Sequence, residues 1–100
     1  MRKVVVLTEA AEDMEQARDF YEAQELGIGD YFTDSILADI ESLPLYHGIH
    51  HRAFGFYRML AHRFPFGIYY RETKTETQVL AVLDLRRDPN WIRKELSWCD

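Results

Sequence analysis

Five arginines between residues 58 and 87 are the side chains best suited to bind a charged partner. A guanidinium group on a rigid strand can hold a phosphate or a carboxylate through two parallel hydrogen bonds. Any one of them could instead be an edge-strand charge that limits aggregation, or an ion-pair partner of Asp84 or Asp88. Two are adjacent at the end of a predicted strand, and this position favours a binding role for that pair. The five are Arg58, Arg63, Arg71, Arg86 and Arg87.

Trp91 follows the adjacent arginine pair, and Trp98 lies in the polar C-terminal segment. A tryptophan in such a place either docks on the core or anchors a partner, and the sequence leaves both roles open. The target-binding residues predicted from the sequence are Arg58, Arg63, Arg86, Arg87 and Trp91.

Three histidines close together suggest a metal site, but their spacing argues against one. His50 and His51 are adjacent, so a regular element would point them apart, and no cysteine joins them. A structural zinc site needs four ligands. We expect no metal and no cofactor, with His47, His50 and His51 as polar loop residues. Cys99 is the one cysteine and is expected to be a free thiol without an assigned role.

A short strand and two helices are expected to form the first part of the chain. Residues 3–7 are rich in valine and predict a first strand. Apolar side chains at helical spacing predict a helix over about residues 9–25 and a second that ends at Pro44. Gly27 and Gly29 mark the short connection between them, so the helices should form an antiparallel hairpin.

The second part of the chain is predicted to form an antiparallel sheet. Residues 45–52 should be an irregular connector. Alternating and apolar runs predict strands over residues 54–64, 66–72 and 78–85, the last being covered on both faces for most of its length. Residues 90–98 should form one or two turns of helix or a loose tail.

The predicted fold is α+β, with the order β-α-α-β-β-β in one domain over residues 1–100. The helical hairpin should cover one face of a small, twisted, mostly antiparallel sheet, and the first strand should pair in parallel with a later one.

Composition supports a compact protein with uneven charge. Hydrophobic residues make up 47% of the 100 residues, which argues against disorder. The net charge is −5, but residues 1–50 carry −8 and residues 51–100 carry +3. Either the molecule has two solvated faces of unequal sign, or a basic face meets an acidic partner or nucleic acid. A single cysteine, no long apolar run and a short apolar start predict a cytoplasmic protein that does not enter membranes.

Four segments resemble the RelE/ParE superfamily of toxins from bacterial type II toxin–antitoxin pairs, also called plasmid stabilisation proteins. The resemblance covers nearly the whole chain. The Arg-Phe-Pro and Arg-Arg-Asp-Pro motifs at this separation are its most specific feature. The segments are residues 20–22, 26–29, 63–70 and 82–89 followed by Trp91.

The resemblance implies one of two activities, both of which inhibit bacterial growth and both of which a cognate antitoxin neutralises. ParE-like members bind DNA gyrase, whereas RelE-like members enter the ribosome and cut messenger RNA. Cleavage needs groups that accept and donate protons, and the family commonly places a tyrosine or histidine near the C-terminus for this. No tyrosine or histidine follows Asp84, and the sequence pI is about 5.3. Both features favour the ParE-like alternative, in which the chain is not an enzyme.

Two alternatives, and the oligomeric state, stay open beside that interpretation. A ribonuclease of this fold would use Arg58, Arg63 and Arg87 on the phosphate, with His62 or Tyr69 as proton carriers. A degenerate member would be a non-toxic binding module. The chain could form a homodimer or a hetero-oligomer with its antitoxin.

Overall fold

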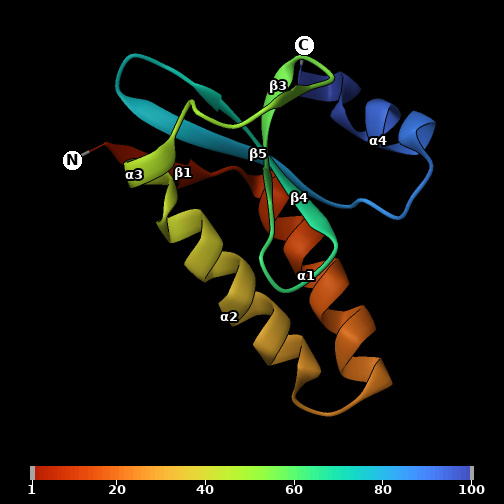
Figure 1. The fold of residues 1–100 in the computed structure, drawn as a ribbon. Helices are drawn as coiled ribbons and strands as arrows, with labels where there is room; N and C mark the ends of the chain where they lie inside the picture. The colour runs from red at the N-terminus through yellow and green to blue at the C-terminus, as the bar shows by residue number, and fades with distance from the viewer. Residues whose placement is uncertain (1, 100) are drawn as a thin grey trace.

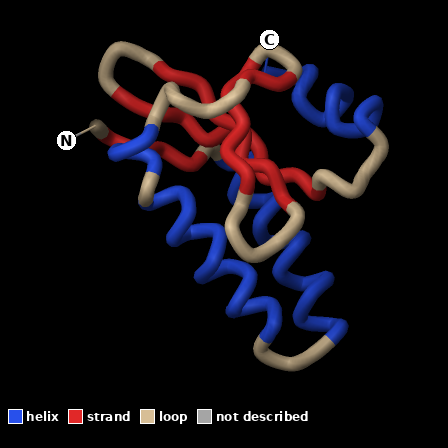
Figure 2. The backbone as a smooth tube through the Cα atoms, in the orientation of Figure 1, coloured by secondary structure: helices blue, strands red, loops and turns tan. Residues whose placement is uncertain are grey.

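The computed structural model describes residues 2–99, apart from the side chain of Cys99, so the expectation for that thiol lies outside the described residues. Five strands, four α-helices and a final 3-10 turn follow one another along the chain (Figures 1 and 2). Their bounds are β1 Lys3–Val6, α1 Thr8–Gln24, α2 Ile28–Glu41, α3 Leu43–Tyr46, β2 Arg52–Ala53, β3 Phe56–Leu60, β4 Phe66–Glu72, β5 Glu76–Asp84, α4 Pro89–Leu96 and η1 Ser97–Cys99.

The strands form one sheet in the order β1-β5-β4-β3-β2. β1 pairs in parallel with β5, and the remaining neighbours are antiparallel, which confirms the predicted topology. β1 pairs only with the first half of β5, because the last paired residues are Val6 and Val79. Beyond them, the Leu7 N–H donates to the Val79 carbonyl. The second half of β5 therefore has β4 on one side and helix α1 on the other.

Helices α1 and α2 form the predicted hairpin and cover one face of the sheet (Figure 1). Their apolar stripes meet Phe66, Ile68 and Val82 in the larger hydrophobic core. Gly27 adopts a left-handed conformation (φ +92°) between the helices. The Glu22 carboxylate accepts the backbone N–H groups of Gly27 and Gly29 and so caps the start of α2.

Gly29 lies inside α2 rather than in the connection, because that helix already begins at Ile28. A Cβ at this position would lie 2.7 Å from the Arg18 carbonyl oxygen and 2.8 Å from the Glu22 Cβ. The absence of a side chain at Gly29 therefore permits the close approach of the two helices.

Helix α4 covers the opposite face of the sheet (Figure 1). Of the two forms expected for residues 90–98, the short helix is the one observed, since an eight-residue helix of about two turns runs from Pro89 to Leu96. Asp88 caps this helix by accepting the Asn90 N–H at 2.8 Å, and Pro89 occupies its first turn. Ile92 and Leu96 are buried against the sheet, so β5 is covered on both faces as predicted.

The segment before β2 is more ordered than the sequence indicated. Pro44 does not end α2, which stops at Glu41, but lies in the first turn of the short helix α3. The segment is also fixed to the sheet, because the buried Tyr70 hydroxyl accepts the Gly48 N–H at 2.9 Å and lies 2.5 Å from His50 Nδ1.

Candidate functional site

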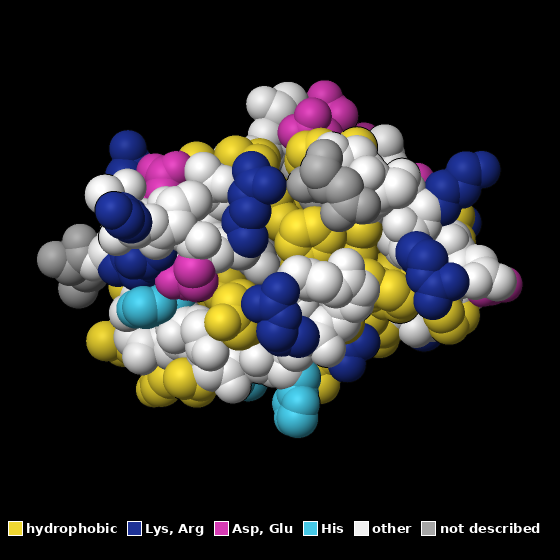
Figure 3. Space-filling model, turned by 90° about the horizontal axis from the view of Figure 1, so that it is seen from above, with side chains coloured by type: hydrophobic (Ala, Val, Ile, Leu, Met, Phe, Trp, Pro, Cys, Tyr) yellow, Lys and Arg dark blue, Asp and Glu magenta, His cyan; other side chains and the backbone are white. Residues whose placement is uncertain are grey.

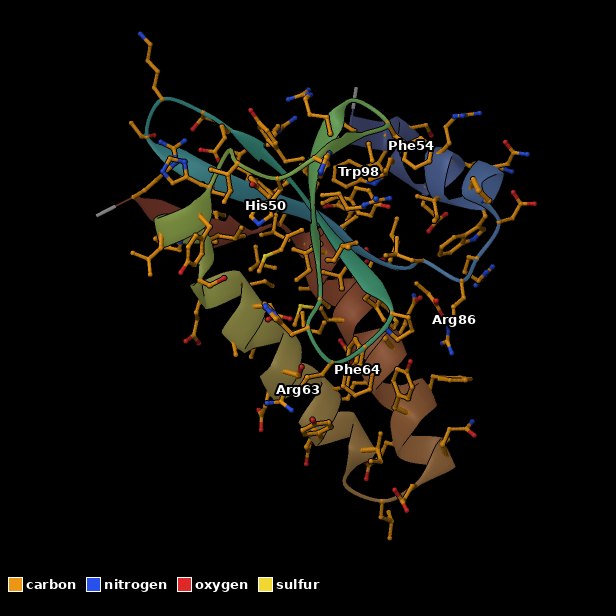
Figure 4. All side chains as sticks on the ribbon, viewed as in Figure 1. His50, Phe54, Arg63, Phe64, Arg86 and Trp98 are labelled. Carbon is orange, nitrogen blue, oxygen red and sulfur yellow. The ribbon has the colours of Figure 1, made fainter. Side chains whose placement is uncertain are left out.

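The predicted binding residues at the end of β5 lie together, but Arg86 is not a free guanidinium. It folds back onto Asp84, with Nη2 at 2.8 Å from Oδ2, and also donates to the Tyr21 hydroxyl at 3.3 Å. The hydrogen bond from Arg86 lowers the pKa of Asp84, and the same contact raises the pKa of Arg86. Arg86 therefore shapes the turn after β5, and its label in Figure 4 lies at this end of the strand.

Arg87, which is exposed, and Trp91, which is half-buried, form one unit at the surface. The guanidinium carbon of Arg87 lies 3.9 Å from the Trp91 ring centroid, which is a close cation–π contact. The capped start of α4 fixes the spacing of the two residues, while the ring of Trp91 also packs against the smaller hydrophobic core under α4. The unit presents a flat cation on an aromatic support, a surface suited to contacts with another macromolecule.

Arg58 and Tyr69 are direct cross-strand neighbours on β3 and β4. They face the side of the sheet that α4 partly covers. Burial raises the pKa of Tyr69, and Arg58 lies close enough to oppose that increase. Arg58 Nε and the Tyr69 hydroxyl are nevertheless both buried without a partner of regular hydrogen-bond geometry among the described residues. Arg71 also belongs to β4 and donates to the Gln78 side chain at 2.7 Å.

His62 and Arg63 lie in the loop between β3 and β4, and both contact helix α2. The label of Arg63 lies over that helix in Figure 4. His62 Nδ1 is 2.5 Å from Asp39 Oδ1, and the His62 backbone N–H donates to the other carboxylate oxygen at 3.0 Å. Arg63 donates to the Tyr31 hydroxyl at 3.1 Å. Both residues therefore belong to the side of the sheet that carries the helical hairpin.

The structure thus divides the sequence-predicted residues among three places. Arg86, Arg87 and Trp91 meet after β5, while Arg58 and Tyr69 meet under α4. His62 and Arg63 meet α2 instead. A phosphate bound at Arg58 would have a fully buried tyrosine beside it and no histidine, because the two suggested proton carriers lie on opposite sides of the sheet.

A cavity between α1 and α4 brings the Arg87–Trp91 unit beside an acidic side chain that the sequence analysis did not single out. Its volume is about 370 Å³, and its lining includes Asp13, Phe20, Tyr21, Phe66, Arg87 and Trp91. Asp13 Oδ2 accepts the Val82 N–H at 3.0 Å, and burial raises the pKa of Asp13 to about 6. The spacing of Asp13 could have identified it as an inward-facing residue, because it lies three residues after Ala10 and four before Ala17 on the apolar face of α1.

The histidines of the predicted connector contact the sheet separately. His47 Nδ1 lies 2.8 Å from Glu72 Oε2, whereas His50 meets Tyr70, and burial lowers the pKa of His50. Within residues 2–99, no group of three or more potential ligands could hold a metal ion. In the same range, no helix combines the length and the apolar character that crossing a bilayer requires.

Charge follows the layers of the fold. Helices α1 and α2 carry ten acidic residues and one basic residue, Arg18. The end of the molecule where α4 and the β2–β3 turn lie shows Lys and Arg side chains around a hydrophobic centre (Figure 3). The unequal halves of the sequence therefore become an acidic helical layer and a more basic sheet and C-terminal region.

Comparison with known proteins adds a structural relationship. No protein-family model and no curated protein matches the sequence. A chain of the solved structure described as "Chromosomal ParDE TA system from P. aeruginosa" superposes with a TM-score of 0.74. The match covers 82% of this chain and 94% of that chain, at 18% sequence identity.

The chain therefore shares the fold of the matched chain in that ParDE structure. The resemblance drawn from the sequence is therefore confirmed at the level of the fold. Similarity of fold does not identify the residues that bind a target, so the roles of Arg58, Arg87 and Trp91 stay predictions.

Proposed function

We propose that this protein is the toxin of a toxin–antitoxin pair of the ParE kind. It acts by binding a macromolecular target of the DNA gyrase type, and a cognate antitoxin neutralises it. The observation that carries the proposal is the fold shared with the ParDE structure, over 82% of this chain and 94% of the matched chain. Two of the four segments that suggested the same family, residues 63–70 and 82–89, include parts of the neighbouring strands β4 and β5.

Binding without catalysis is the activity that the geometry favours. Cleavage of RNA needs a proton acceptor and a proton donor within hydrogen-bond reach of one phosphate. Tyr69 is 0% exposed, and His62 is held by Asp39 on the other side of the sheet. The net charge of −5 also gives little general attraction to the phosphates of a ribosome.

The target-binding surface in this proposal is centred on Arg87 and Trp91. Both project at the start of α4, and their stacking holds the guanidinium in one orientation before a partner binds. Such preorganisation lowers the entropic cost of binding, because fewer rotamers are lost. Arg58 and Arg63 lie on other surfaces and are secondary candidates for target contacts.

The ribonuclease alternative has one observation in its favour. Arg58 and Tyr69 are neighbours with buried atoms that lack partners, and such atoms can mark a site that awaits a ligand. In that case Arg58→Ala would abolish messenger RNA cleavage in cells, while Arg87→Ala would have a smaller effect.

The test is induced expression in a bacterial host with separate pulse-labelling of DNA and protein synthesis. We expect DNA synthesis to stop first and Arg87→Ala to delay that arrest. Lys74→Ala is the matched control, since it removes one positive charge from the exposed β4–β5 loop. Translation stopping first, with cut messenger RNA, would overturn the proposal in favour of the ribonuclease.

Growth that continues despite soluble, folded protein and no antitoxin would show a non-toxic binding module instead. The partner is tested separately, by co-expression of the small reading frame adjacent to the gene. Restored growth and a complex that co-purifies would support neutralisation by a cognate antitoxin.

A further inference from the structure

The groove between α1 and α4 is larger than the single cavity beside Trp91. A second hollow of about 280 Å³ adjoins the first and shares Asp13, Gln16 and Glu95 with it. Both hollows are lined on one side by residues of α1 and on the other by residues from α4 or its flanks. A ligand that filled both would be longer than one side chain.

Asp13 carries a negative charge that nothing near it balances. Burial is the main cause of its raised pKa, and the like charges of Glu95, Glu12 and Glu9 add to the effect. One carboxylate oxygen accepts the Val82 N–H. Among the described residues, Asp13 forms no ion pair.

Arg87 and Lys94 line the two hollows, but neither forms an ion pair with Asp13 in the described part of the chain. Arg87 stacks on Trp91 and lies beside Asp84, whose pKa it helps to lower. The site therefore has excess negative charge at its centre.

Aromatic rings form much of the wall of the first cavity. Trp91 projects from α4, Phe20 and Tyr21 project from α1, and Phe66 contributes from β4. The cavity is accessible, because Phe20 at its rim is 56% exposed. Aromatic faces and a carboxylate together favour an organic cation on an apolar stem over a neutral or anionic group.

We propose that this groove binds a basic segment of a partner polypeptide, with an arginine or lysine side chain in the aromatic cavity and Asp13 as its counter-ion. The length of the two joined hollows favours a polypeptide over a small amine. The acidic surface of α1 and α2 would also attract a basic segment and speed its association. This binding does not depend on toxicity and goes beyond the proposed function.

The test uses NMR with ¹⁵N-labelled protein and the blocked tripeptide acetyl-Gly-Arg-Gly-amide. The Trp91 indole N–H, assigned against a Trp98→Phe variant, and the Val82 amide report on the cavity. We expect both signals to shift in a saturable manner at pH 7.5. The neutral, nearly isosteric citrulline tripeptide should bind about tenfold more weakly, as loss of a charge-assisted hydrogen bond predicts.

Asp13→Asn is the decisive variant, because asparagine can still accept the Val82 N–H but has no charge. It should bind the arginine tripeptide about tenfold more weakly than the unmodified protein. Asp34→Asn is the matched control, since it removes the same charge from an exposed position on α2 and should leave binding unchanged. Glu95→Gln is a second variant in the groove and should also weaken binding.

Three results would overturn the proposal. They are the absence of a saturable shift at millimolar peptide, equal affinity for the arginine and citrulline peptides, and Asp13→Asn binding within twofold of the unmodified protein. Tighter binding of agmatine than of the tripeptide would assign the site to a free amine instead of a polypeptide. Each result is independent of the growth assay, so failure here and failure of the toxin proposal are distinguishable.

Discussion

Replacing Asp13 with asparagine should stabilise the protein at neutral pH. The side chain of Asp13 lies between α1 and the edge of β5, where its Oδ2 accepts the Val82 N–H. Asparagine keeps an acceptor for that N–H and occupies nearly the same volume. The variant therefore removes the buried charge while the packing and the hydrogen bond are retained.

The magnitude follows from the pKa of Asp13, which burial raises from 3.8 to about 6. A shift of about two pKa units, at about 1.4 kcal/mol each, sets an upper bound near 3 kcal/mol. Asp13 is only partly buried, and solvent screening lowers the expected gain to about 1–2 kcal/mol. For a domain of this size the melting temperature should rise by roughly 5–10 °C.

The pH dependence has a defined sign. Between pH 3.8 and about 6 the folded state holds a proton on Asp13 that the unfolded chain has lost. This contribution to stability is therefore present at low pH and is lost as the pH rises through about 6. Asparagine has no such proton, so the advantage of the variant should be near zero at pH 4 and complete above about pH 7.

Urea unfolding followed by circular dichroism at pH 4, 5, 6, 7 and 8 measures this difference. Asp34→Asn is the control, and its effect should stay within about 0.5 kcal/mol because the side chain is exposed. A difference between Asp13→Asn and the unmodified protein that stayed constant with pH would refute the reasoning. A variant less stable at pH 7 would show that the charge itself stabilises the folded state.

Three further predictions concern packing, the connector and the surface. Gly29→Ala should lower the free energy of unfolding by about 1–2 kcal/mol in urea denaturation, since overpacking against the Arg18 carbonyl outweighs the gain in helix propensity. Ala38→Gly, at an exposed position of the same helix, measures the effect of helix propensity alone. An unchanged free energy of unfolding in Gly29→Ala would contradict the close helix contact. Tyr70→Phe should cost about 1–3 kcal/mol by the same assay, because it leaves the Gly48 N–H without its acceptor; unchanged stability would mean that water replaces the hydroxyl. Arg87→Ala should change stability by less than about 1 kcal/mol, since only an exposed cation–π contact is lost, and yet should weaken growth inhibition; a variant that fails to fold would show that Arg87 has a structural role.

Local patterns in the sequence were sufficient to predict the main elements of the fold. Apolar residues at helical spacing predicted the α1–α2 hairpin, and Gly27 supplies the left-handed turn at its tip. Period-two and apolar runs predicted β3, β4 and β5 but not the two-residue strand β2. The rules for connections predicted that the first strand pairs in parallel with a later strand, and the structure shows that this strand is β5. These signals are local because helix and strand periodicity depend on neighbours along the chain.

The sequence left residues 90–98 open between a short helix and a loose tail, since these polar residues show a weak local pattern. Ile92 and Leu96 are only two apolar anchors, and their burial depends on the smaller hydrophobic core formed by β3, β4 and β5. That core lies on the face of the sheet opposite the α1–α2 hairpin. Tertiary packing therefore decided between the helix and the tail.

The arrangement of the candidate site depended on contacts between residues far apart in the sequence. His62 and Tyr69 are only seven residues apart, but Asp39 draws His62 toward α2 while the pleat points Tyr69 under α4. Asp13 meets Val82 across 69 positions, and burial in the folded structure raises the pKa of the carboxylate although the hydrogen bond from Val82 opposes the increase. The sequence by itself determined the elements and their order, because these follow from periodicity and turn residues. Only the tertiary structure decided which charged groups share an environment, because burial and proximity arise when the layers pack together.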